Sequence, residues 1–120
     1  MAIKRISSRG LLWLEPLIEV EVDGKRFGFG PVAVADIAGL VKAGLFDRKR
    51  VADLRHPLAI GDVSKHPFLA RQQRLTFARA GLTDPLSLAD YRATGGFLGL
   101  AKALALCPAG TVAAVLASGL

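Results

Sequence analysis

The strongest constraint on the fold is a β-hairpin pattern close to the start of the chain. Residues 18–22 (IEVEV) alternate apolar and acidic side chains, as a β-strand with one buried and one solvated face does. Asp23-Gly24 comes directly after them and favours a two-residue hairpin turn. Residues 25–29 (KRFGF) predict the return strand, with both phenylalanines on a common face. That apolar face needs a covering element.

A helix is predicted immediately after the hairpin. Residues 34–43 have helical spacing, with Ile37, Leu40 and Val41 facing inward, and Gly44 ends the helix. The order of hairpin and helix indicates an α+β protein. A sheet this small with one covering helix is only marginally stable, so further packing is expected.

The middle of the chain has weaker patterns. Residues 46–62 are predicted to be a linker, because they are charged, contain Pro57 and Gly61, and have no sustained apolar period. A helix is predicted over residues 67–80, with apolar side chains along one side and Gly81 as its stop.

The last third of the chain predicts three short helical pieces. Residues 85–90 fit a first helical turn with Asp84 as its N-cap. Gly95-Gly96 breaks the pattern, and helical spacing resumes from Phe97. Pro108 ends that helix and opens the next one.

Residues 97–118 form an apolar run that could suggest a membrane span. Such a span needs about 20 uninterrupted apolar residues. Lys102 lies inside the run, and Pro108 and Gly110 split it into two short halves. Two packing helices are therefore predicted here, and no transmembrane segment.

Composition leaves two explanations open for the apolar surface. Hydrophobic residues make up 52% of the chain and the mean hydropathy is +0.39, which is high for an isolated domain. Either the core is rich in alanine and leucine, or partner subunits or further chain cover some of the surface.

The net charge of +6 raises the possibility of nucleic-acid binding. The basic residues are scattered, however, and the one dense cluster, residues 47–50, begins with an acid and has no interleaved aromatic residues. We therefore predict no nucleic-acid partner and keep nucleic-acid binding as the weakest alternative.

Candidate reactive residues are few. Cys107 is the single cysteine, so it cannot form an internal disulfide or hold a metal ion alone. His56 and His66 both neighbour prolines in loop-like sequence and offer Cys107 no convincing catalytic partner, so the thiol is expected to be inert. The start of the chain, MAIKRISSRG, lacks the apolar segment of a signal peptide, and a cytoplasmic location is expected.

Residues 91–120 (YRATGGFLGLAKALALCPAGTVAAVLASGL) resemble the N-terminal lead-in of the NADH-binding flavoprotein subunits. That family includes the flavoprotein of respiratory complex I, the diaphorase subunit of NAD-reducing hydrogenases and the β subunit of NAD-dependent formate dehydrogenases. The matching elements are Tyr91, Gly95-Gly96-Phe97, residues 101–104 (AKAL), residues 117–120 (ASGL) and, upstream, residues 66–68 (HPF), 72–75 (QQRL) and 81–85 (GLTDP).

The start of the chain resembles the second half of the thioredoxin-like [2Fe–2S] ferredoxin domain found beside, or fused to, these flavoproteins. That domain has a Cys-x-Gly-x-Cys loop, with a proline four residues after the second cysteine. Laying Pro16 on that proline puts Gly10 on the glycine, Ser8 on the first cysteine and Leu12 on the second. Serine and leucine cannot hold iron as thiolates do, so the resemblance implies the scaffold without its cluster. Residues 8–24 are most similar to formate dehydrogenase β subunits.

The resemblance implies a fold and a domain organisation. Residues 1–45 would form the C-terminal half of a thioredoxin-like domain, a β-hairpin plus helix, without cluster cysteines. Residues 46–62 would be the linker, and residues 63–120 a short all-α lead-in to an FMN- and NADH-binding domain that this chain lacks.

The implied function is that of an N-terminal fragment of an NAD(H):FMN oxidoreductase subunit, with a formate dehydrogenase β subunit as the nearest type. The parent protein would pass electrons between NAD(H), FMN and iron–sulfur centres, including a [4Fe–4S] cluster. Within residues 1–120 we expect no catalytic, cofactor-binding or metal-ligating residues. The implied partners are other subunits of an NAD-dependent dehydrogenase complex. The alternative is a non-catalytic adaptor or assembly module that docks on a redox complex.

Overall fold

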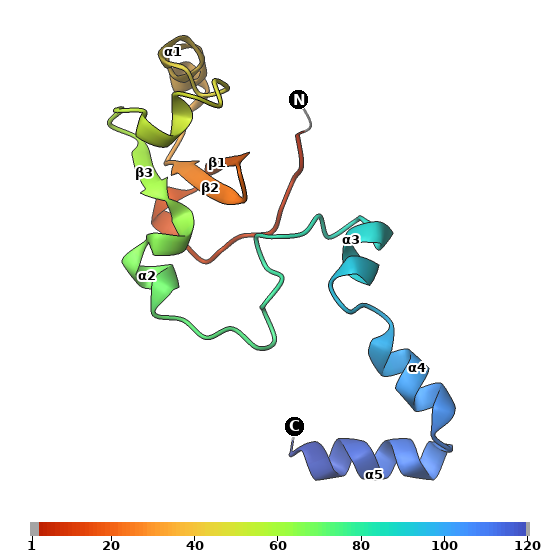
Figure 1. Ribbon diagram of the computed structural model, residues 1–120. Helices are drawn as coiled ribbons and strands as arrows, with labels where there is room; N and C mark the ends of the chain where they lie inside the picture. The colour runs from red at the N-terminus through yellow and green to blue at the C-terminus, as the bar shows by residue number, and fades with distance from the viewer. Residues whose placement is uncertain (1–2, 120) are drawn as a thin grey trace. The chain divides into compact units, whose positions relative to one another are not determined.

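The computed structural model describes residues 3–119 and divides into two compact units (Figure 1). The first, which we call the sheet unit, comprises Ser8–Ala78. The second, the helical unit, combines the residues before Ser8 with those from Arg79 onward. All strands in the described part of the chain lie in the sheet unit, and separate helices accompany them, so the chain is an α+β protein as predicted.

The sheet unit is built on a three-stranded antiparallel sheet in the order β1-β2-β3 (Figure 1). Strands β1 (Ile18–Val22) and β2 (Lys25–Phe29) pair along their whole length and form the predicted hairpin. Asp23 and Gly24 in the turn have φ of 50° and 75°, which a two-residue turn of this kind requires. The residues of the two strands and of the turn are therefore sufficient to specify this hairpin.

Residues 46–62 do not form the predicted linker. Strand β3 (Ala59–Asp62) lies in this stretch and pairs antiparallel with the outer edge of β2, with Phe29 opposite Ala59. The unpaired N–H and C=O groups at the edge of a hairpin are a template for another strand, and this chain fills that edge itself.

The same stretch also contributes to the core. The 3-10 turn at Val51–Asp53 buries Val51, and Leu54 and Leu58 pack against the core cluster. Gly61 lies inside β3 at φ 74°. A strand that contains such a glycine has the composition of a loop, which explains why the sequence pattern missed it.

The core lies on the apolar face of the hairpin, as the alternation predicted. Phe29 is 1% exposed and Leu40 is completely buried, so both contribute fully to the hydrophobic stabilisation of the unit. The buried cluster consists of Val22, Phe29, Val32, Leu40, Leu45 and Val51, with Ile18, Val20 and Phe27 packed against it.

Helix α1 (Ile37–Ala43), preceded by a single 3-10 turn, confirms the helix predicted after the hairpin. Gly44 ends the helix at φ 112°, and its N–H donates to the Leu40 carbonyl. Of the three residues predicted to face inward, Leu40 is buried, whereas Ile37 and Val41 are 38% and 46% exposed. The helix therefore covers the core through a narrower stripe than its apolar spacing suggested.

The helix predicted over residues 67–80 is wrong in its length, because α2 spans only Pro67–Ala70. Irregular turns come after it, in which Leu75 and Phe77 are 88% and 71% exposed. A short helix in water depends on packing its apolar face, and these two side chains find no apolar cover. Helical spacing of apolar residues was therefore not enough to form a helix beyond Ala70.

The helical unit contains α3 (Leu88–Ala93), α4 (Leu98–Ala105) and α5 (Pro108–Ser118) (Figure 1). Helices α4 and α5 confirm the two helices predicted on either side of Pro108. Among residues 3–119, no helix has both the length and the hydrophobicity to span a bilayer.

Helix α3 begins later than the turn predicted at residues 85–90. Its N-cap is Ser87, whose Oγ accepts a hydrogen bond from the Asp90 N–H at 3.1 Å. Asp84 instead accepts from the Leu86 N–H at 2.9 Å and closes a turn before the helix. Two good capping residues compete in this sequence, and the second one starts the helix.

Candidate functional site

The candidate site is the loop of residues 8–16, where the resemblance places the ligand positions of a [2Fe–2S] cluster. Gly10 has φ 80°, and a 3-10 turn (Leu12–Leu14) comes after it. The Ser8 hydroxyl donates to Glu15 Oε1 at 2.5 Å and accepts from the Gly10 N–H at 2.9 Å. These two hydrogen bonds close the loop upon itself.

Neither side chain at the two positions that the resemblance implies as cluster ligands is a thiolate. Ser8 is exposed and engaged within the loop, and Leu12 is 70% exposed. An iron–sulfur cluster needs cysteine thiolates at such positions. In the described part of the chain, no three His, Cys, Asp or Glu side chains come together to hold a metal ion.

A nearly buried ion pair fixes the loop to strand β1. The Nε and Nη2 atoms of Arg9 donate to the two carboxylate oxygens of Glu19 at 2.5 and 2.8 Å, in bidentate geometry. Their side chains are only 12% and 6% exposed. Arg26 on β2 approaches the same carboxylate at 3.6 Å. The Glu19 carboxylate is therefore within 4 Å of two guanidinium groups.

Sequence reasoning missed this cluster. It placed Glu19 on the solvated face of β1 and counted Arg9 among scattered basic residues. A partial signal was available, because the hairpin register puts Arg26 opposite Glu21 and diagonal to Glu19. No pattern in the sequence showed that Arg9 would fold back over this face.

The loop also contacts the segment around helix α2. Nη2 of Arg74 donates to the Arg9 carbonyl at 2.6 Å. The Trp13 ring meets Phe68 edge to face, with centroids 5.2 Å apart and planes at 86°, and lies 6.4 Å from the His66 ring. Contacts with β1 and with the α2 segment therefore both stabilise the loop.

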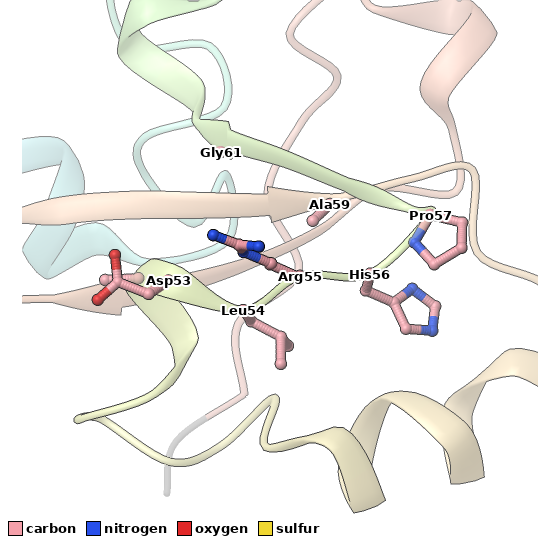
Figure 2. A pocket seen from close by; sticks show the side chains of 8 residues that line it. Asp53, Leu54, Arg55, His56, Pro57, Ala59 and Gly61 are labelled. Atoms are coloured by element: carbon pink, nitrogen blue, oxygen red, sulfur yellow. The ribbon is translucent and has the colours of Figure 1, made fainter.

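A surface pocket of ≈ 610 Å³ lies in the segment that leads into β3 (Figure 2). Asp53, Arg55 and His56 supply its ionisable side chains. Figure 2 shows Leu54 and His56 on one side of this segment and Arg55 on the other. Nδ1 of His56 accepts from the Leu58 N–H at 3.2 Å, which orients the ring. The lining contains no cysteine, serine, threonine or tyrosine, so it offers neither a thiol nor a hydroxyl nucleophile.

Cys107 and His66 both serve as helix caps. Sγ of Cys107 accepts from the Gly110 N–H at 3.4 Å at the start of α5, and the thiol is exposed. Nδ1 of His66 accepts from the Phe68 N–H at 3.3 Å at the start of α2. Both side chains occupy N-cap positions, where an acceptor satisfies a free backbone N–H.

The Gly95-Gly96-Phe97 corner in the helical unit has a packing explanation. Tyr91 and Phe97 meet edge to face with centroids 4.9 Å apart, and the Arg79 guanidinium lies 4.9 Å from the centre of the Tyr91 ring. A Cβ atom on Gly96 would collide with Tyr91 Cδ1 and with the Tyr91 carbonyl oxygen, so only glycine fits beneath this ring. The corner thus joins α3 to α4 around one tyrosine.

Asp90 in the same unit should titrate at an unusually low pH. The Asp84 N–H donates to its carboxylate at 3.1 Å, and Lys4 donates at 3.3 Å; these bonds, in that order, lower the Asp90 pKa from its ordinary 3.8. Because the pKa is lowered in the folded state, the stabilisation is present above the ordinary value and is lost as the pH falls through the lowered pKa.

We expect an NMR titration of the Asp90 side-chain carbon to have its midpoint below 3.8. Lys4→Ala should move this midpoint part of the way back up, since the backbone hydrogen bond remains. Lys102→Ala in α4 is the matched control and should leave it unchanged. A midpoint at or above the ordinary aspartate value would contradict the prediction.

Comparison with known proteins assigns no family to this arrangement. No protein-family model matches the chain, and no curated protein matches it.

Proposed function

We propose that the chain is the N-terminal part of the NADH-binding flavoprotein subunit of an NAD-dependent oxidoreductase, most similar to the β subunit of formate dehydrogenase. The whole subunit would pass electrons between NAD(H), FMN and iron–sulfur centres in the cytoplasm, together with other subunits of the complex. Residues 1–120 would support the cofactor domain without binding a cofactor themselves.

The observation that carries this proposal is the loop of residues 8–16 together with the elements directly after it. In the alignment that the resemblance implies, Gly10, which has a positive φ, falls on the glycine of the ligand motif, and Ser8 and Leu12 fall on its cysteines. The hairpin and helix α1 then come in the order expected for the C-terminal half of a thioredoxin-like domain. Strand β3 is an additional element, because the resemblance implied only a β-hairpin and a helix.

The ion pair in the loop is consistent with a scaffold that has lost its cluster. A cluster cross-links its ligand loop, and a loop without one needs another constraint to keep a single conformation. Here the bidentate contact between Arg9 and Glu19 supplies that constraint at low exposure. Tyr91 and the Gly95-Gly96-Phe97 corner also match the flavoprotein lead-in, and their packing against one another gives them a structural role.

The test is to read the coding sequence beyond codon 120 and to purify the natural gene product with an affinity tag. We expect an in-frame glycine-rich flavin-binding run, about one FMN released per chain, and NADH-dependent reduction of ferricyanide. Residues 1–120 expressed alone should show no flavin absorbance at about 450 nm, because that band requires bound isoalloxazine. A coding sequence without a flavin run would contradict the parent assignment. A stoichiometric yellow preparation of residues 1–120 would contradict the supporting role.

A second candidate function, an adaptor that docks on a redox complex, is favoured by the surfaces of α4 and α5. Lys102 is the only charged residue from Leu98 to Ser118, and the large apolar side chains on these helices are well exposed, from 54% at Leu100 to 78% at Leu104. Surfaces of this kind mark protein interaction sites. Size-exclusion chromatography separates the two functions: a stable soluble monomer of residues 1–120 supports the adaptor, and aggregation supports a segment that needs its parent protein.

A further inference from the structure

Strand β1 has an outer edge that no other strand covers. The sheet has the order β1-β2-β3, so β1 lies at one edge, and it pairs with β2 over all five of its residues (Figure 1). The side of an edge strand that faces away from the sheet presents N–H and C=O groups without a partner. The register of the hairpin shows which residues carry these groups.

The turn of the hairpin sets the hydrogen-bonding pattern of β1. Val22 and Lys25 flank the two-residue turn, and both turn residues, Asp23 and Gly24, have a positive φ. In a hairpin with such a turn, the two flanking residues form a hydrogen-bonded pair. Val22 therefore points its N–H and C=O toward β2.

The outward-facing backbone groups of β1 belong to Glu19 and Glu21. Because hydrogen-bonded pairs alternate along an antiparallel ladder, Ile18 and Val20 point toward β2 as Val22 does, and the two glutamates point away from it. Among residues 3–119, no other segment hydrogen-bonds to the N–H or C=O of either glutamate. Their hydrogen bonds to other residues run through the carboxylates. The β1 edge therefore has free donors and acceptors.

The two edges of the sheet differ in how well they could accept another strand. Strand β1 contains no proline, lysine or bulge, which are the devices that blunt many edge strands. Strand β3, at the other edge, has only four residues, carries Gly61 at φ 74° and shifts its register against β2. Only β1 therefore offers a regular template for a further strand.

The core face of the sheet is incompletely covered toward β1. Ile18 and Val20 pack against the buried cluster, but both are only half-buried, whereas Phe29 on the central strand is 1% exposed. Apolar side chains on an added strand would lie beside Ile18 and Val20 and take their remaining surface out of water.

The other face of β1 presents one well-exposed charge. The Glu21 side chain is 60% exposed, and Arg26 approaches it from the β2 side at 3.2 Å. A residue opposite Glu21 on an added strand would be its direct neighbour on the open side, where an opposite charge stabilises the pair and a like charge destabilises it. A cationic side chain fits this position. A second copy of β1 does not, because its alternation would put glutamate opposite glutamate.

We propose, independently of the function argued above, that the β1 edge binds an extended segment of a partner protein as a fourth, antiparallel strand. The side chains of this segment alternate between apolar residues beside Ile18 and Val20 and cationic residues opposite Glu19 and Glu21. Main-chain hydrogen bonds to the two glutamates supply the affinity, and the alternation supplies the selectivity.

The first test is amide hydrogen exchange, measured by NMR on the chain of 120 residues. In the free chain, the amides of Val20 and Val22 should exchange slowly and those of Glu19 and Glu21 quickly, since only the first two are bonded to β2. A synthetic peptide with the centre Val-Lys-Val-Lys-Val is the probe. At saturation it should slow exchange at Glu19 and Glu21 by at least about tenfold.

The matched control peptide has the centre Ile-Glu-Val-Glu-Val, which is the sequence of β1 itself and represents a second copy of the chain. It should bind at least about threefold more weakly than the lysine peptide. The chain carries a net charge of +6, so unspecific attraction would favour the acidic peptide instead. A preference for the lysine peptide would therefore report on the side chains of the β1 edge.

Two N-methylated forms of the lysine peptide isolate the main-chain hydrogen bonds without changing the protein. In the antiparallel arrangement, the lysine N–H groups point toward β1 and the valine N–H groups point away. Methylating the lysine amides should raise the dissociation constant at least about tenfold, because two hydrogen bonds are lost. Methylating the valine amides should change it less than about twofold.

The variant Glu21→Pro removes one outward N–H and leaves the bonds to β2 in place, so it should weaken the lysine peptide at least about tenfold. Glu21→Ala keeps that N–H and is the matched control, with an expected change below about threefold. Slow exchange at Val20 and Val22 shows that the hairpin is intact in each variant. Slow exchange at Glu19 and Glu21 in the free chain, no slowing by the lysine peptide, equal affinity of the two methylated forms, or tighter binding of the acidic peptide would overturn the proposal.

Discussion

Replacing Phe29 by alanine is expected to lower the free energy of unfolding of the sheet unit by about 3–5 kcal/mol. Phe29 is 1% exposed, ends strand β2 and packs in the cluster that joins the hairpin to α1 and to the segment before β3. Removing its ring takes away buried apolar area and leaves a cavity that the surrounding backbone cannot fill completely. For a unit of this size, such a loss is a large part of the total stability.

The measurement is urea denaturation of the 120-residue chain, followed by Trp13 fluorescence, because the only tryptophan lies in the sheet unit. Phe77→Ala is the matched control: it makes the same change in the same unit, at a side chain that is 71% exposed. We expect the control to remain within about 0.5 kcal/mol of the wild type. Equal losses for the two variants would show that the core is not centred on Phe29.

Replacing Glu19 by alanine is expected to cost about 3 kcal/mol, the second large effect. The change leaves the guanidinium of Arg9 only 12% exposed and without its carboxylate, so its desolvation is no longer compensated. Arg26 also loses its contact with Glu19 but keeps the one with Glu21.

Glu21→Ala provides the control for this second prediction. Glu21 lies on the same strand and pairs with Arg26 at 3.2 Å, but its side chain is 60% exposed, and we expect a loss below about 1 kcal/mol. The double variant Arg9→Leu/Glu19→Leu should recover part of the stability lost in Glu19→Ala, because no uncompensated Arg9 charge remains. If Glu19→Ala were as mild as Glu21→Ala, the loop would not depend on the buried pair.

The burial of Phe29 could be predicted from the sequence, whereas the burial of Glu19 could not. Phe29 could be assigned to the core before the structure was known, because the alternation of residues 25–29 and the Asp23-Gly24 turn define the register of the hairpin. Glu19 could not, because the same alternation gives it a solvated position. Its burial results from Arg9, ten residues earlier, folding back over the strand.

The candidate site shows the same division. The family resemblance implied that Ser8, Gly10 and Leu12 share one loop, and in the structure all three lie in the segment before β1, with Leu12 at the start of a 3-10 turn. That Trp13 would meet His66 and Phe68, more than fifty residues away along the chain, had no signal in the sequence. The contact between this loop and the α2 segment therefore became visible only in three dimensions.

The sequence by itself determined the elements whose stability is local. The β1–β2 hairpin results from its alternation and its turn residues, α1 from its spacing and Gly44, and α4 and α5 from the helical periods on either side of Pro108. Each of these elements is specified by neighbours within a few residues, through backbone conformation and capping.

Only the tertiary structure decided the elements that depend on distant partners. Strand β3 exists because β2 offers it a free edge, and helix α2 stops at Ala70 because no apolar surface covers Leu75 and Phe77. Pairing between strands and the burial of a side chain are set by residues far apart in the chain, and a local pattern carries no information about which distant residues will meet.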